Sequence, residues 1–135
     1  MKDDGILDFS HPDLHDYKFF CFNGEVKCFK IDFNRQTDHH ANYYDRDGHL
    51  MPFGEKDYLP EPDKNIEMPE ELSKMINLAE TLSKGKVFVR IDFYNLQGQV
   101  YFGEITFYPA SGMGKFEPKE WDYKIGEWLK LPNGV

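Results

Sequence analysis

The alternation of apolar and polar residues predicts two β-hairpins. Aromatic residues dominate 16–22, and 25–33 alternates well enough to be the partner strand. Asn23-Gly24 between them is a strong signal for a two-residue hairpin turn. A second pair of strands is predicted at 87–95 and 100–108, around a loop that contains Gly98.

The spacing of apolar residues becomes helical between the two hairpins. Pro69 suits the first helical position and Gly85 the position just past the end of the helix. The predicted buried stripe of this helix is Leu72, Met75, Ile76, Ala79 and Leu82. A last helix is predicted after Pro118, with a buried stripe of Trp121, Ile125, Trp128 and Leu129. We expect the two tryptophans to serve in core packing rather than in stacking on a sugar.

The remaining segments are less regular. We expect 1–15 to be a loose leader and 133–135 a tail, so that one domain covers 16–132. Two short pieces at 42–45 and 50–51 are candidates for a third hairpin, 54–67 for a surface connection, and 109–114 for a glycine-containing hinge. The order of elements predicts an α+β fold of antiparallel hairpins, with both helices packed on one side.

Composition excludes several classes of protein. The chain has 135 residues and a formal charge of −8, which disfavours nucleic acid and anionic membrane surfaces as partners. An acidic protein can still bind ATP where a few basic side chains and a metal ion lie close together. We find neither a membrane-spanning run nor a secretory signal, and we expect a cytoplasmic location. If the first hairpin pairs regularly, Cys21 and Cys28 are buried thiols on one face rather than a disulfide.

The second hairpin carries the candidate chemistry. Arg90 and Asp92 share one face of their strand, and Glu104 and Thr106 share one face of the next. A three-residue loop with Gly98 in a left-handed bulge would set Asp92 opposite Glu104 and Arg90 opposite Thr106. Facing carboxylates repel unless a cation lies between them, and Mg²⁺ prefers such ligands. The alternative is an exposed, solvated cross-strand salt-bridge patch.

Histidines offer a second candidate site. His39 and His40 follow Asp38, and His11 and His15 lie near the amino terminus. Zinc needs three or four converging ligands, and no partner shows a familiar spacing. Loop histidines without a metal are therefore the favoured interpretation.

Longer stretches of the chain resemble a known family. The stretches are DYKFFCFNG at 16–24, VRIDFY at 89–94, YFGEITFYP at 101–109, and EWDYKIG at 120–126, together with PASGM at 109–113. They resemble the TupA-like ATP-grasp family, which is linked to teichuronic acid and other cell-surface polysaccharides and is often labelled glycosyltransferase. The resemblance covers about 16–132.

The resemblance implies roles for five residues. Asp92 and Glu104 would bind Mg²⁺, Arg90 would be the catalytic residue that stabilises the transferred phosphoryl group, and Lys18 would contact phosphate of the cofactor ATP. Thr106, the third candidate metal ligand, stands where many ATP-grasp enzymes have asparagine, and its hydroxyl is a weaker metal ligand than an amide oxygen.

The family's activity is implied in the same way. ATP would convert a carboxylate substrate to an acyl phosphate, which couples to an amine or similar nucleophile, in polysaccharide biosynthesis with a carboxylate or saccharide substrate. No glycine-rich loop or lysine-bearing strand precedes Asp16, so the chain is interpreted as the C-terminal subdomain of the ATP-grasp fold, inactive alone. The N-terminal half is then either a separate polypeptide or a part lost from a truncated gene product. The alternatives are a glycosyltransferase, or a non-catalytic module that binds a partner through exposed aromatics of the first hairpin.

Overall fold

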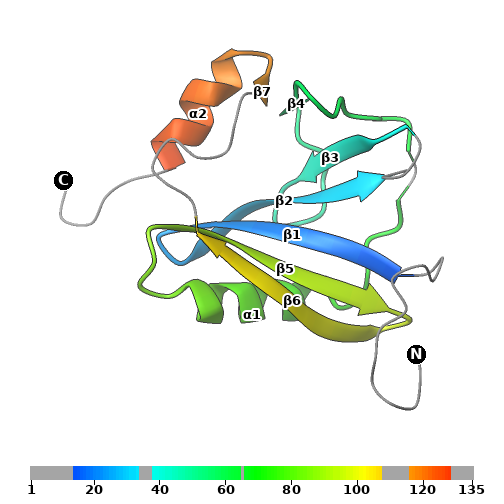
Figure 1. The fold of residues 1–135 in the computed structure, drawn as a ribbon, viewed down its shortest axis with the longest axis vertical. Coiled ribbons are helices and arrows are strands. Elements are labelled where there is room, and N and C mark those ends of the chain that lie inside the picture. The colour runs from blue at the N-terminus through cyan, green and yellow to red at the C-terminus, as the bar shows by residue number, and fades with distance from the viewer. Residues whose placement is uncertain (1–13, 34–37, 65, 108–115, 129–135) are drawn as a thin grey trace.

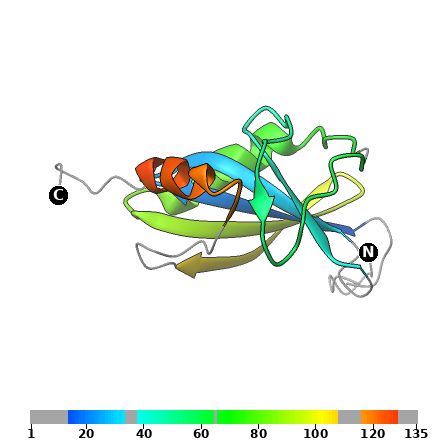
Figure 2. The ribbon, with the colours of Figure 1, turned by 90° about the horizontal axis from the view of Figure 1, so that it is seen from above.

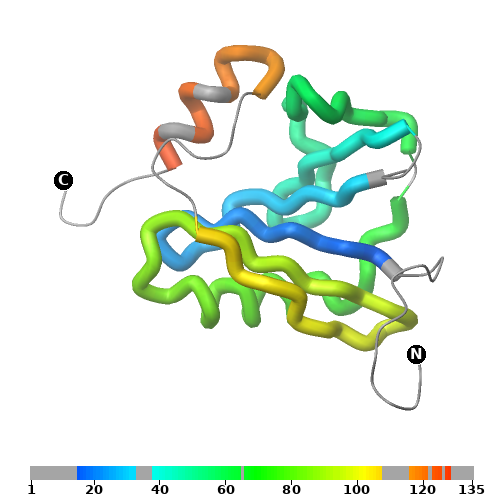
Figure 3. Tube along the Cα trace, in the orientation of Figure 1, coloured from blue at the N-terminus to red at the C-terminus, as the bar shows by residue number. Residues whose placement is uncertain are grey.

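The structure is a computed structural model that describes residues 14–33, 38–64, 66–107 and 116–128 (Figure 3). Most of the predicted leader, the hinge at 109–114, Leu129 and the tail lie outside the described residues. In chain order the elements are β1 (Leu14–Phe22), β2 (Glu25–Phe33), β3 (His40–Tyr44), β4 (Gly54–Glu55), α1 (Leu72–Ser83), β5 (Phe88–Leu96), β6 (Gln99–Phe107), β7 (Phe116–Glu117) and α2 (Glu120–Trp128) (Figure 1). This is the predicted α+β class.

Five antiparallel strands form the main sheet in the order β3-β2-β1-β5-β6. The two predicted hairpins, β1–β2 and β5–β6, therefore lie side by side, joined through β1 and β5. Figure 2 shows the twist of this sheet. Strands β4 and β7 form a separate two-stranded ladder.

Both long hairpins close with two-residue turns. Asn23 and Gly24 have φ of 53° and 83°, and Gln97 and Gly98 have φ of 51° and 86°. Positive φ at both central positions matches the right-handed twist of the flanking strands. The turn at Asn23-Gly24 is confirmed, whereas the three-residue loop expected around Gly98 is wrong, because Leu96 pairs directly with Gln99.

Helix α1 covers one face of the sheet and α2 packs on the other. Phe19 and Cys21 of β1 belong to the core that contains Met75 and Ala79 of α1. Phe20 and Phe22, which point the other way, belong to the core that contains Ile125 of α2. The expectation that both helices pack on one side is wrong, because alternate side chains of β1 supply apolar surface to both faces.

Helix α1 differs from its prediction at its first residue and at the C-terminal end of its buried stripe. It begins at Leu72, after a turn in which the Leu72 amide donates to the Pro69 carbonyl. Pro69 therefore precedes the helix, while Gly85 follows it with φ of 80°, as predicted. Met75, Ile76 and Ala79 are buried as expected, but Ser83 is buried and Leu82 is exposed.

The cysteines are free and buried, as predicted, but they lie in the two different cores. A bulge between Phe20 and Cys21 shifts the β1–β2 register, so Cys28 pairs with Phe20. Burial raises the pKa of the Cys21 thiol to about 11 and raises that of Cys28 as well. Both thiols are therefore protonated and unreactive at neutral pH.

The aromatic residues of the first hairpin are core, not an exposed surface. Phe19, Phe20 and Phe22 are all buried. The prediction that exposed aromatic residues of this hairpin bind a partner is therefore wrong. The two tryptophans of α2 pack as predicted: Trp121 stacks on Phe53 with ring centroids 4.8 Å apart, and Trp128 lies 5.7 Å from Phe22. In the part of the chain that the structure describes, no helix has the length and apolar character to span a bilayer.

Candidate functional site

Polar side chains of the two hairpins meet on the sheet face opposite α1. Lys18 on β1 pairs with Asp92 on β5 and with Lys30 on β2. Arg90 lies two residues before Asp92 on the same face. The structure thus gathers all five predicted site residues, Lys18, Arg90, Asp92, Glu104 and Thr106, on three neighbouring strands.

The β5–β6 register is the one expected at the site. Asp92 lies opposite Glu104, and Arg90 lies opposite Thr106. The turn is one residue shorter than expected, but a bulge between Asp92 and Phe93 shifts the register by one position. Gly103 is the extra residue of β6, and a Cβ there would lie 2.8 Å from Tyr94 Cε2 and 3.1 Å from the Asp92 carbonyl oxygen. Glycine therefore permits the bulge that aligns the carboxylates.

Arg90 binds both carboxylates. Its Nε donates to Asp92 Oδ1 at 2.7 Å, and its Nη2 donates to Asp92 Oδ2 at 2.8 Å. The same Nη2 lies 3.5 Å from Glu104 Oε1. The guanidinium is thus the cation that offsets the repulsion between Asp92 and Glu104.

The two carboxylates differ in their contact with solvent. Asp92 is 3% exposed, whereas the Glu104 side chain is 64% exposed. Burial raises the pKa of the Asp92 carboxyl above its ordinary value, although Arg90 and Lys18 oppose the increase. Holding an ionised Asp92 here costs free energy of folding, and a cation bound to it would offset that cost.

Lys18 is surrounded by carboxylates. It is 7% exposed, its Nζ contacts Asp16 Oδ2, and it lies 3.4 Å from Asp32 Oδ2. These contacts fix the Lys18 side chain beside Asp92, with which Lys18 pairs across β1 and β5.

Sequence reasoning missed the part of this charged face that lies on β2 and β4. Lys30 Nζ lies 3.0 Å from Glu55 Oε2 and 3.8 Å from Asp32 Oδ1. His39 Nε2 lies 2.9 Å from Asp32 Oδ1. Burial by itself raises the pKa of Asp32, but Lys30, His39 and Lys18 together bring it below its ordinary value. Regular pairing of the first hairpin would set Phe29 opposite Lys18, so the sequence did not indicate Lys30. The bulge between Phe20 and Cys21 shifts the register and sets Lys30 opposite Lys18 instead.

The histidines of the third strand region make structural contacts. His39 packs on Tyr58 with ring centroids 3.9 Å apart. His40 Nδ1 lies 2.7 Å from the Leu59 carbonyl oxygen and its Nε2 lies 3.0 Å from Asp38. Those hydrogen bonds, to Leu59 first, raise the His40 pKa. Among the described residues, one group of three potential metal ligands lies close together: Asp45, Asp47 and His49, within 4.8 Å of one another in an exposed turn.

The donor set on the charged face fits a divalent cation. Asp92 and Glu104 supply the hard oxygen ligands that Mg²⁺ prefers, from facing positions of adjacent strands. The Arg90 guanidinium binds both carboxylates and supplies the positive charge between them in this structure. Thr106 is half-buried beside Arg90 and adds a hydroxyl.

The fold and this face define a small antiparallel α+β protein whose sheet carries the arginine, lysine and paired carboxylates with which proteins hold phosphates and their metal ions. A family model of the TupA-like ATPgrasp proteins matches residues 1–130. The chain belongs to this family. No curated protein and no solved structure matches the chain.

Proposed function

We propose that the charged face binds Mg²⁺ and the phosphates of ATP, and that the chain is the metal-bearing part of an ATP-grasp enzyme of cell-surface polysaccharide biosynthesis. The observation that supports this most is the register that sets Asp92 opposite Glu104 with Arg90 between them. Membership of the TupA-like ATPgrasp family supports nucleotide as the ligand.

Each residue has a separate task in this proposal. Asp92 and Glu104 hold the Mg²⁺ ion, which neutralises phosphate charge when bound. Arg90 keeps contact with Asp92 through one edge of its guanidinium and donates from another to the transferred phosphoryl group, as its five donors allow. Lys18 contacts a phosphate oxygen while Asp16 and Asp32 fix its position.

Catalysis needs more than this face. Phosphoryl transfer depends on positioning and on excluding water, and Glu104 is open to solvent. We therefore propose that a separate N-terminal half covers the site, and that this chain alone binds Mg·ATP without transferring phosphate to its carboxylate or saccharide substrate. The proposed location is the cytoplasm, where ATP is available.

The proposal is tested by titrating the chain with a non-hydrolysable ATP analogue, with and without Mg²⁺, by calorimetry and thermal unfolding. Ligand that binds only the folded chain raises its unfolding temperature. We expect Asp92→Asn and Glu104→Gln to weaken the Mg²⁺-dependent binding by at least about tenfold, a change of roughly 1.4 kcal/mol. Asp63→Asn and Glu70→Gln make the same chemical changes at exposed positions elsewhere and should bind as wild type does. Identical responses of wild type, Asp92→Asn and Glu104→Gln would remove the metal assignment.

A second candidate function is a non-catalytic module that binds a partner chain. It is favoured by Phe102 and Phe107, which are 55% and 63% exposed on β6, an edge strand of the sheet. Light scattering distinguishes the candidates. A dimer that Phe102→Ser and Phe107→Ser dissociate, with no response to Mg²⁺ and nucleotide, would favour the binding module.

A further inference from the structure

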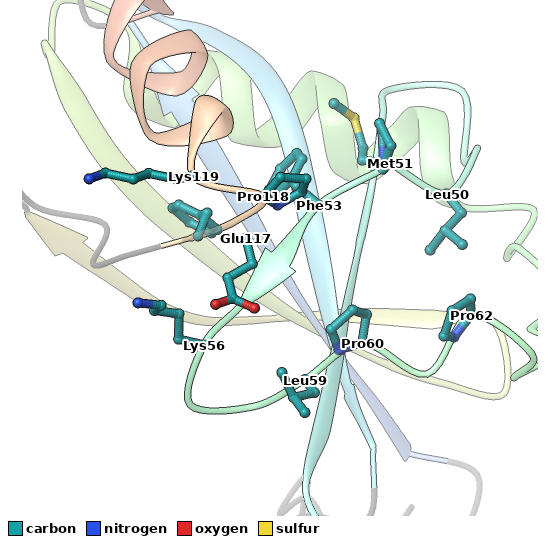
Figure 4. A pocket seen from close by; sticks show the side chains of 12 residues that line it. Leu50, Met51, Phe53, Lys56, Leu59, Pro60, Pro62, Glu117, Pro118 and Lys119 are labelled. Carbon is teal, nitrogen blue, oxygen red and sulfur yellow. The ribbon is translucent and has the colours of Figure 1, made fainter.

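A cavity of about 960 Å³ lies beside the β4–β7 ladder (Figure 4). Pockets for small organic molecules measure roughly 300–1,000 Å³ and are lined mainly by apolar groups. Apolar side chains from the 50–62 segment and from β7 form most of this lining, among them Leu50, Phe53, Leu59, Pro60 and Phe116. The cavity shares no lining residue with the Lys18–Arg90–Asp92–Glu104 face.

One wall of the cavity is fixed by hydrogen bonds to β3. The fully buried Asn42 accepts from the Glu61 amide at 2.7 Å and donates to the Glu61 carbonyl oxygen at 3.0 Å. His40 bonds the Leu59 carbonyl oxygen, as described above. Gly54 lets this wall approach β4, because a Cβ there would lie 2.6 Å from Pro60 Cδ. These contacts hold Leu59 and Pro60 in place without a ligand.

The floor of the cavity is equally well fixed. Gly54 and Glu55 of β4 pair with Glu117 and Phe116 of β7. Phe53 and Phe116 are buried with ring centroids 5.3 Å apart, and Trp121 supports Phe53 from α2. A ligand would therefore enter a preformed pocket and avoid the entropic cost of ordering it.

The rim of the cavity carries two lysines and one glutamate. Lys56 directly follows β4, and Lys119 directly precedes α2. Both line the cavity, as does Glu117 (Figure 4). Within the described residues, neither lysine takes part in an ion pair. Among the described lining residues, two ammonium groups and one carboxylate give a net positive charge, in a chain whose formal charge is −8.

We propose that this pocket is a second binding site, for a small organic anion with an apolar body. The apolar body lies on Phe53, Leu59 and Pro60, and a carboxylate or phosphate is bound by Lys56 and Lys119. Charge complementarity selects the anion, and the fixed apolar lining selects a ring or short chain over a strongly hydrated ion. This site does not depend on the proposed Mg·ATP function.

Two fluorescent probes test the charge and the apolar contributions separately. Anilinonaphthalene sulfonate is apolar and anionic, and N-phenylnaphthylamine is a neutral molecule of similar shape. We expect the full chain to bind one molecule of the anionic probe. In the double variant Lys56→Met/Lys119→Met, the dissociation constant of the anionic probe should rise at least about tenfold. The dissociation constant of the neutral probe should change less than about twofold.

Two further variants complete the design. Lys74→Met removes an exposed charge from α1 and should leave the binding of both probes unchanged. Leu59→Asp alters a side chain that is 53% exposed, so the fold tolerates it, and it should weaken the binding of both probes. The inference is overturned if the double lysine variant binds the anionic probe as well as wild type does. It is equally overturned if Leu59→Asp has no effect, or if wild type binds neither probe with a defined stoichiometry.

Discussion

At the scale of single residues, Gly103 decides the geometry of the candidate site. The sequence predicted the pairing of Asp92 with Glu104 through a loop of three residues, yet the loop has two and the bulge at Gly103 supplies the missing offset. The signal for this bulge was present, since an isolated glycine inside a strand often marks one. The pairing was thus predicted correctly from a partly wrong model of the hairpin.

Replacing Gly103 tests this role. In Gly103→Ala the new Cβ meets Tyr94 Cε2 and the Asp92 carbonyl oxygen, and overpacking of this kind costs about 1–3 kcal/mol of unfolding free energy. Denaturant unfolding measures the loss, and Mg²⁺-dependent nucleotide binding should weaken with it. In a Tyr94→Ala background the same substitution should cost less, because the closest contact is gone. An alanine variant as stable as wild type would show that the bulge does not require glycine.

Single residues also distinguish the two interpretations of the charged patch, a metal site and a solvated salt-bridge patch. A solvated salt-bridge patch describes Glu104 but not Asp92, which is buried and bound through both oxygens to Arg90. Spacing alone could not distinguish these interpretations, because alternation gives the face of a side chain and not its depth.

At the scale of elements, α1 shows which buried side chains helical periodicity predicts and which it does not. The stripe correctly predicted Met75, Ile76 and Ala79 but included Leu82, which is exposed, instead of Ser83. Helix α1 packs on β1, β2 and β5. Leu78 and Leu82 stay exposed although they belong to the same helix, and a helical repeat does not encode which strands lie beneath it.

A matched pair of truncations in α1 measures this difference. Met75→Ala leaves a cavity in the core beneath the helix and should lower the unfolding free energy by about 2–5 kcal/mol. Leu82→Ala removes an exposed side chain and should change it by less than about 0.5 kcal/mol. Chemical denaturation of both variants checks the assignment. A loss for Leu82→Ala as large as that for Met75→Ala would contradict the observed rotation of the helix, because the predicted stripe buried both side chains.

At the scale of the whole molecule, the site depends on a long-range pairing that the local sequence does not specify. Each hairpin could be predicted from its turn and its alternation, but the pairing of β1 with β5 could not, and this pairing brings Lys18 beside Asp92. The family resemblance implied a phosphate contact for Lys18, and this role stays a prediction. The pairing of β1 with β5 sets Lys18 opposite Asp92. The sequence analysis did not predict Asp16 and Asp32 as ion-pair partners of Lys18, because no recognised motif assigns either residue a role.

The position of a bound metal ion tests the central claim most directly. Mn²⁺ takes the same oxygen ligands as Mg²⁺ and broadens the NMR signals of nearby amides. With the non-hydrolysable nucleotide present, we predict that substoichiometric Mn²⁺ broadens the amide signals of Asp92, Glu104 and Lys18 first, and that Glu104→Gln abolishes this pattern. Broadening centred instead on the Asp45–His49 turn, with β5 and β6 unaffected, would contradict the account.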